Sequence, residues 1–163
     1  MLGFNDTSED GANRMGEILQ FLSDTYEDKI IYVLKVPHVG KEYYNNGISV
    51  TSSPFNVAID QYNKMISEFC SEIGNVRLID STSNMMTGDL YLDEKYTSTS
   101  YKDNGEVKER GLHLNYTGFE LWYHSIKDCI ANGKSSADLE KFKMIYVSEQ
   151  KFDEMCQSAS SSN

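Results

Sequence analysis

The chain has 163 residues, of which 39% are hydrophobic and 12% aromatic, and it carries a formal net charge of −10. This length fits one domain with a packed core, and the acidity argues against nucleic acid as a partner, because little here would neutralise a phosphate backbone. No run of 18 apolar residues predicts a membrane span and no secretory signal is present, so a cytoplasmic location is the default expectation, with a secreted parent protein left open.

The first part of the chain alternates between strand and helix patterns. Residues 1–6 resemble the end of a buried strand, and residues 10–26 repeat apolar side chains at the spacing of one helix face. Residues 29–39 form a β-branched run closed by Pro37, which is typical of a mostly buried strand.

The middle of the chain begins with a polar segment and continues with a helix and a strand. We expect a loop at residues 40–52, with Asn45-Asn46-Gly47 as its turn signal. Ser53 is the predicted N-cap of a helix that reaches about Ile73, and residues 76–80 predict another short strand.

A long polar segment precedes the last clear helix. Residues 81–110 are rich in tyrosine, and we expect an irregular loop with a turn at Asp103-Asn104-Gly105. The helix spans about residues 117–131, and Thr117 and Glu120 fit a capping box at its start.

The C-terminal residues and the cysteines carry little functional information. Residues 132–163 are expected to be an extension, helical first and then disordered in a serine-rich tip. Cys70 and Cys129 are predicted core residues on helices. The chain has three cysteines, without metal-site spacing, so they indicate neither a disulfide framework nor a metal site.

The order of the predicted elements indicates the fold class. Strands that alternate with helices are typical of parallel strands joined by helical crossovers, so the sequence predicts an α/β fold with a parallel sheet flanked by helices. Ligands of such folds bind beyond the carboxyl ends of the strands. Asn5, His38 and the segment 81–115 would all lie at that end.

The segment Gly111-Leu112-His113-Leu114-Asn115 places a histidine in a predicted loop just before the last helix. Its two leucines are expected to dock the loop on the core and to hold the imidazole in place. An imidazole held in this way can act as a general base near neutral pH, and a purely structural histidine is the alternative.

Asn5 follows Gly3 and Phe4 at the end of the first strand pattern. Its side-chain amide can donate a hydrogen bond to an oxyanion, whereas an ordinary turn asparagine beside Asp6 is the alternative. A histidine base and an asparagine amide, each at a junction between a loop and a helix, make up half of an ester-hydrolysing site. The other half is a nucleophile, which would lie upstream.

These two segments resemble two of the four sequence blocks of the SGNH/GDSL hydrolase superfamily. Gly3-Phe4-Asn5-Asp6 matches its Gly-x-Asn-Asp block, and residues 110–119 match its Asp-x-x-His block except at the first position. The resemblance covers about residues 1–131, which would be a partial hydrolase domain with a three-layer, flavodoxin-like fold. It implies that a serine attacks a small acyl or acetyl ester, including an ester on carbohydrate, and forms an acyl-enzyme.

The resemblance also implies a role for individual residues. His113 would be the general base, and Asn5 would be an oxyanion donor. Gly3 would allow the tight exit from the strand, and Asp6 would lie beside it at the substrate. His38 is expected to be a wall of the same cleft, with a second base as the alternative.

The chain departs from the family at the nucleophile and at the acid. It has no Gly-Asp-Ser block, and the strands that normally precede the Gly-x-Asn-Asp block are missing. Arg110 stands three residues before His113, where the family has aspartate. Glu109 is the nearest substitute and would need a local shift, with Glu106 and Asp103 as further alternatives. Because the members of a triad act as a unit, this chain alone is expected to lack serine esterase activity.

Other side chains support alternative functions less well. The three histidines lack the spacing of a metal site, so no metal and no cofactor is predicted, and His124 is expected to be a partly exposed helix residue. The acidic pairs do not indicate a two-carboxylate glycosidase. The tyrosines near the long loop can stack on sugar or anchor the loop; they are Tyr91, Tyr96, Tyr101, Tyr116 and Tyr123.

Three interpretations follow. The preferred one is the C-terminal portion of an ester hydrolase, cut near its third block, whose intact parent acts on a small-molecule ester. The second is a non-catalytic carbohydrate-binding or interaction module derived from such an enzyme. The third is one half of an assembly in which another chain supplies the missing strands, because an open hydrophobic sheet edge invites pairing.

Overall fold

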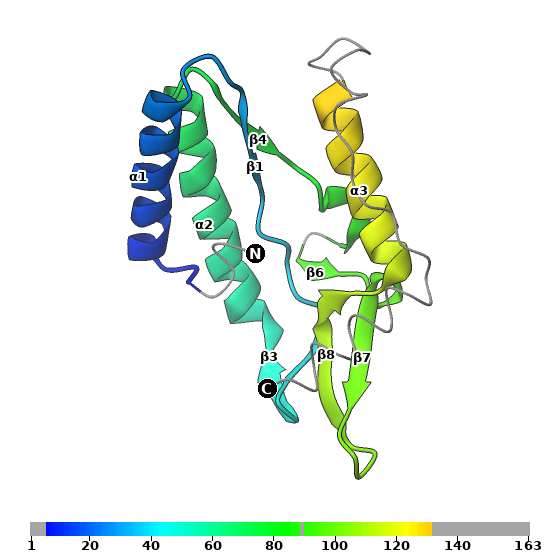
Figure 1. Cartoon of the computed structure of the whole chain (residues 1–163). Coiled ribbons are helices and arrows are strands. Elements are labelled where there is room, and N and C mark those ends of the chain that lie inside the picture. Colours follow the sequence, from blue (N-terminus) through cyan, green and yellow to red (C-terminus); the bar gives the residue numbers. More distant parts are fainter. Residues whose placement is uncertain (1–5, 89, 132–163) are drawn as a thin grey trace.

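The computed structural model describes residues 6–88 and 90–131, so the predicted extension at 132–163 lies outside the described residues (Figure 1). The helical elements are α1 (Glu9–Thr25), α2 (Ser52–Glu72), η1 (Ser83–Met85), η2 (Glu94–Tyr96) and α3 (Tyr116–Ala131). The strands are β1 (Ile31–Leu34), β2 (Glu42–Asn45), β3 (Ile48–Thr51), β4 (Val76–Ile79), β5 (Met86–Thr87), β6 (Tyr91–Leu92), β7 (Thr97–Tyr101) and β8 (Val107–Leu114).

The centre of the fold is a parallel pair of strands with helices on both faces (Figure 1). β1 pairs with β4 in parallel. α1 and α2 cover one face, where Ile59 and Ile66 of α2 are at the centre of a buried cluster. α3 covers the other face, where Ile126 and Ile130 contact Ile79. The predicted α/β class, with parallel strands between layers of helix, is therefore confirmed.

The segments predicted as loops form a second sheet, which is antiparallel and has the strand order β3-β2-β8-β7. Both turn signals are confirmed. Asn46 and Gly47 have φ values of 53° and 82° and close the hairpin between β2 and β3, while Gly105, with a φ of 82°, lies in the turn between β7 and β8. The loops predicted at 40–52 and 81–110 are wrong, because these strands are short, polar and half-exposed and so lack the apolar runs that indicate a strand.

The helices begin and end within about two residues of the predicted positions, but two caps differ. The N-cap of α2 is Thr51, without a side-chain cap hydrogen bond, and not the predicted Ser53. The side chain of Asn115, not that of Thr117, accepts the cap hydrogen bond from the Gly118 backbone N–H, at 2.9 Å. Asn115 also donates to the carbonyl of Lys95 at 2.7 Å, so the same amide ties α3 to η2. Asparagine performs this role because its carbonyl oxygen and its NH₂ group bond in opposite directions.

The cysteine prediction is half right. Cys70 is buried on α2, whereas Cys129 is exposed on α3. In this half of α3 the buried residues are Ile126 and Ile130, which pack against Ile79. Cys129 is therefore not part of the core, and Cys156 lies outside the described residues.

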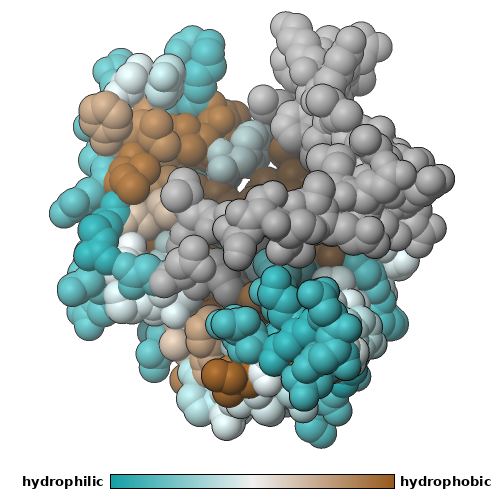
Figure 2. Space-filling view, turned by 60° about the horizontal axis from the view of Figure 1, so that its bottom comes forward, coloured by the Kyte–Doolittle hydropathy of each residue, from teal (hydrophilic) through white to brown (hydrophobic). Residues whose placement is uncertain are grey.

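The narrow sheet leaves apolar surface uncovered. The outer edge of β1 has no strand partner within residues 6–88 and 90–131, and its four residues are only half-buried. Figure 2 shows hydrophobic surface gathered on the side of α1 and α2, and mostly hydrophilic surface at the bottom of the view. Exposed large apolar residues of α1 and of the approach to β1 are Ile18, Phe21, Tyr26 and Ile30. In the described part of the chain no helix is long and apolar enough to cross a membrane.

Candidate functional site

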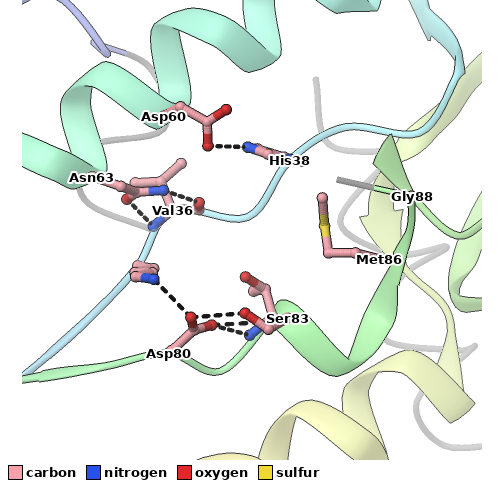
Figure 3. Close-up of a pocket in the computed structure, with 10 residues that line it drawn as sticks. Val36, His38, Asp60, Asn63, Asp80, Ser83, Met86 and Gly88 are labelled. Atoms are coloured by element: carbon pink, nitrogen blue, oxygen red, sulfur yellow. Dashed lines mark hydrogen bonds and ion pairs between the residues drawn. The ribbon is translucent and has the colours of Figure 1, made fainter. Parts of the chain in front are cut away.

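A polar cavity of about 260 Å³ lies beyond the carboxyl ends of β1 and β4 (Figure 3). The chain after β1 contributes Lys35 and His38, and the chain after β4 contributes Asp80. Helix α2 closes another side with Asp60. This is the end of a parallel sheet at which α/β folds bind their ligands. The remaining lining residues are Val36, Asn63, Thr82, Ser83, Met86 and Gly88.

Two asparagines of α2 hold the segment that leaves β1. Asn63 accepts from the Val36 N–H and donates to the Val36 carbonyl, both at 2.8 Å. Asn56 accepts from the Val39 N–H at 2.8 Å and donates to the Val39 carbonyl at 2.9 Å. Each amide replaces a missing neighbouring strand, because it satisfies both backbone groups of one residue. His38 lies between these two clamps, so its backbone is fixed on both sides.

The clamped segment places His38 on the wall of the cavity. Its Nε2 lies 2.8 Å from Oδ1 of Asp60, whose side chain is 57% exposed, while the His38 side chain is only 8% exposed. The His38 Nδ1 is buried and has no hydrogen-bond partner within residues 6–88 and 90–131. A general base needs a free nitrogen that a substrate can reach. This geometry favours a wall position over a second base. The cavity that His38 lines does not include His113, so its predicted place in the same cleft as His113 stays a prediction.

Asp80 is the most strongly perturbed acid at the cavity. Partial burial by itself would raise the pKa of its carboxyl group, but hydrogen bonds from Lys35 Nζ at 2.6 Å and Ser83 Oγ at 2.7 Å, with the charge of Lys35, lower the pKa from 3.8 to about 2. Asp80 therefore stays ionised in the folded protein far below neutral pH. It ties the exits of β1 and β4 together (Figure 3).

Replacing Asp80 by asparagine is expected to lower the free energy of unfolding by about 1 kcal/mol at pH 7. This value is smaller than the full shift of the Asp80 pKa would give, because the side chain is 39% exposed and solvent screens its charge. The folded pKa is depressed, so this contribution is present above about pH 4 and is lost as the pH falls through about 2. Urea unfolding of both proteins from pH 7 to about pH 2 measures it. The control is Asp128→Asn, an exposed acid on α3. A difference that stays constant as the pH falls below 4 would contradict this assignment.

The structure places His113 within strand β8, so the prediction of a loop position is wrong. β8 pairs with β7 on both sides of a shift in register, which lies just before His113. Thr97 pairs with Leu114 and Thr99 pairs with Arg110. From one pair to the next the chain advances by two residues on β7 and by four on β8, so β8 has two extra residues here. Gly111 lies in this bulge with a φ of 74°.

The bulge brings Glu109 to His113. In a regular strand, residues four apart have their Cα atoms about 13 Å from each other, too far for their side chains to meet. Here Nε2 of His113 lies 3.7 Å from Oε2 of Glu109. This is an ion-pair distance and is longer than a hydrogen bond, as is common for catalytic pairs without a bound substrate. The His113 side chain is 65% exposed, so solvent reaches the imidazole.

The other candidate acids lie elsewhere. Arg110, at the position where the family has aspartate, bonds Glu42 of β2 at 2.6 Å. Glu106 contacts Lys102 at 3.4 Å and belongs to the turn between β7 and β8. Glu109 is therefore the carboxylate that the described chain brings to His113.

The predicted residues at the start of the chain are only partly described. Asp6 is exposed, accepts a hydrogen bond from Ser8 Oγ at 2.5 Å and pairs with Arg14 of α1. It therefore stabilises the start of α1 and does not line the cavity. Asn5 and Gly3 lie outside the described residues, so their predicted roles stay predictions.

Sequence reasoning missed several residues of the cavity. Lys35 and Asp80 directly follow β1 and β4 in the structure, but the predicted strands at 29–39 and 76–80 included them, so the rule that parallel strands end at one edge did not single them out. Asn63 carries a weaker signal, because it is a polar residue on the buried side of a helix, whereas Asp60 is exposed and carries no such signal. The tyrosines proposed for sugar stacking do not line the cavity.

Comparison with known proteins gives one likeness of fold. No family model matches the sequence, and no curated protein matches it. A solved structure from Streptococcus pneumonia, described provisionally as a platelet activating factor, is similar with a TM-score of 0.60 at 22% sequence identity. The match covers 79% of this chain and 54% of that chain, so this chain spans about half the length of the structure it resembles. At this identity the likeness shows the fold alone.

Proposed function

We propose that this chain carries the general-base part of an ester hydrolase of the SGNH/GDSL type. The observation that supports this most directly is the contact between His113 and Glu109 across the Gly111 bulge. The bulge supplies the local shift that a glutamate at position 109 needs in order to replace the family's aspartate. The proposal includes a three-layer, flavodoxin-like arrangement for residues 1–131, which the likeness in fold supports without identifying the family.

The proposed reaction uses a serine outside these 163 residues, because they contain no Gly-Asp-Ser block. His113 takes the proton of the serine hydroxyl, the serine oxygen attacks the ester carbonyl, and Glu109 stabilises the resulting imidazolium. Asn5 donates to the oxyanion. The alcohol leaves with the proton from His113, and a water that His113 deprotonates releases the acid from the acyl-serine. Small acyl or acetyl esters, including those of carbohydrates, are the proposed substrates.

The base can be tested without the serine. p-Nitrophenyl acetate is an activated ester that a free imidazole hydrolyses slowly, so the 163-residue chain should release p-nitrophenol in a slow steady phase without an acyl-serine burst. The imidazole nitrogen attacks the carbonyl of this ester, p-nitrophenolate leaves, and water hydrolyses the acetyl-imidazole. We expect His113→Ala to lower this rate about fivefold and Glu109→Gln to lower it about twofold, because a carboxylate beside the ring stabilises the positive charge that the attack places on it. The matched control is His124→Ala, which removes another exposed histidine, on α3.

Two results would count against the proposal. Equal losses in His113→Ala and His124→Ala would mean that Glu109 confers no advantage on His113. A burst of one equivalent of p-nitrophenol that survives in His113→Ala would mean that a nucleophile within these residues acts without this base.

A further inference from the structure

The cavity beyond β1 and β4 has hydrogen-bonding groups that its own residues do not use. Within residues 6–88 and 90–131 the Asp60 carboxylate contacts only His38, through Oδ1, so Oδ2 can accept from a ligand. The Lys35 ammonium has three N–H bonds and gives one of them to Asp80. Thr82 is 7% exposed and lines the cavity, and its hydroxyl makes no hydrogen bond within the described chain.

These groups exclude charged ligands of the common kinds. A phosphate would face the carboxylates of Asp60 and Asp80, and only Lys35 would attract it. A divalent cation has no group of three His, Cys, Asp or Glu residues to hold it in the described part of the chain, and it would lie beside the Lys35 ammonium. An organic cation would meet the same ammonium. The ligand that fits is therefore neutral and carries both donors and acceptors.

We propose that this cavity binds a neutral polyhydroxyl ligand of the size of one sugar ring. A hydroxyl group donates and accepts at once, so neighbouring hydroxyls can donate to Asp60 Oδ2 and accept from Lys35 Nζ and Thr82 Oγ1. Met86 provides apolar surface for the C–H groups of such a ring. A volume of about 260 Å³ holds one ring and little more.

The site is independent of the proposed ester hydrolysis, because none of the residues that line the cavity is the base or its acid. The cavity is nevertheless linked to the segment of the proposed base by a backbone hydrogen bond. The segment that lines the cavity at His38 continues to Gly40, whose N–H donates to the Gly111 carbonyl at 2.7 Å. Gly111 is the bulge residue two positions before His113.

Binding can be measured directly by saturation-transfer NMR and calorimetry. The probes are glucose, galactose, xylose, N-acetylglucosamine and sorbitol as neutral ligands, with choline and inorganic phosphate as charged ones. A ligand of about 12 heavy atoms should bind with a dissociation constant in the low millimolar range. We expect Asp60→Asn to weaken the best neutral ligand about tenfold, because the amide keeps one acceptor oxygen, which His38 occupies, and replaces the ionised acceptor that faces the ligand by an NH₂ group. Thr82→Val removes a hydroxyl and should weaken binding about fivefold. Asp128→Asn on α3 is the matched control and should bind as the unchanged chain does.

Several results would overturn the site. One is the absence of saturable binding by any of the neutral probes up to about 100 mM, far above the expected constant. Another is stronger binding of choline or phosphate than of any sugar. A third is sugar binding that both Asp60→Asn and Thr82→Val leave unchanged while their melting curves show a folded chain. The esterase measurement on His113→Ala is separate, so either proposal can fail without the other.

Discussion

Replacing Asn56 by leucine is expected to lower the free energy of unfolding by about 4 kcal/mol and Tm by roughly 15 °C. Asn56 is fully buried and makes three hydrogen bonds. Leucine has a similar volume but leaves the Val39 N–H and the Leu90 carbonyl without this partner, while the Val39 carbonyl keeps the hydrogen bond from the Leu92 N–H at 3.2 Å. An unpaired buried backbone group costs about 1–3 kcal/mol, more than the added apolar contact returns.

Urea unfolding followed by circular dichroism measures the effect, and two further variants define its cause. Asn63→Leu also leaves two backbone groups, the N–H and the carbonyl of Val36, without this partner, but Asn63 is 9% exposed whereas Asn56 is fully buried, so it should cost less, about 2–3 kcal/mol. Asn13→Leu changes an exposed asparagine of α1 and should stay within about 0.5 kcal/mol of the unchanged protein. If Asn56→Leu were no worse than Asn13→Leu, the clamp would not stabilise the segment after β1.

Replacing Gly111 by alanine is expected to cost about 4 kcal/mol and to separate Glu109 from His113. A Cβ atom at this position would overlap the carbonyl oxygen of Glu42 and would lie 3.4 Å from the Cα of Gly40. The φ of 74° adds the ordinary cost of a left-handed residue. Because β2 and the segment at Gly40 are both packed against the bulge, we expect the strand to shift rather than to absorb the methyl group.

The matched control for crowding is Gly105→Ala. Gly105 has a similar φ of 82°, but nothing lies within 4 Å of an added Cβ atom, so only the backbone cost of about 1–2 kcal/mol remains. The difference between the two variants therefore isolates the contact with Glu42. Urea unfolding measures the stabilities, and the His113-dependent hydrolysis of p-nitrophenyl acetate should fall in Gly111→Ala and persist in Gly105→Ala. Equal stabilities in the two variants would contradict the close approach of β2 to the bulge.

Much of the parallel layer could be predicted because its signals are local. The apolar periodicity of α1 and α2 and the β-branched run at β1 depend on residues near one another in the chain, and so does the turn at Asn46-Gly47. The strands of the antiparallel sheet were missed for the opposite reason. Thr97–Tyr101 and Val107–Leu114 are polar and half-exposed, and they become strands by pairing with each other.

The candidate site was likewise predictable only where its signals are local. Sequence reasoning found His113 and named Glu109 as its nearest substitute acid, but the contact between them depends on a bulge that no short motif encodes. The cavity residues come from three places, namely the ends of two strands and the middle of a helix. Their meeting depends on the parallel pairing of β1 with β4 and on the packing of α2.

The amino-acid order by itself determined the α/β class, the helices and the turns, since each of these arises from contacts within a few residues. Only the tertiary structure decided which carboxylate stands beside His113 and which polar side chains face a common cavity. The physical reason is that a hydrogen bond or an ion pair needs its partners within a few ångströms. In this chain that closeness is produced by strand register, by one glycine with a positive φ, and by two buried asparagines whose partners lie far away in the sequence.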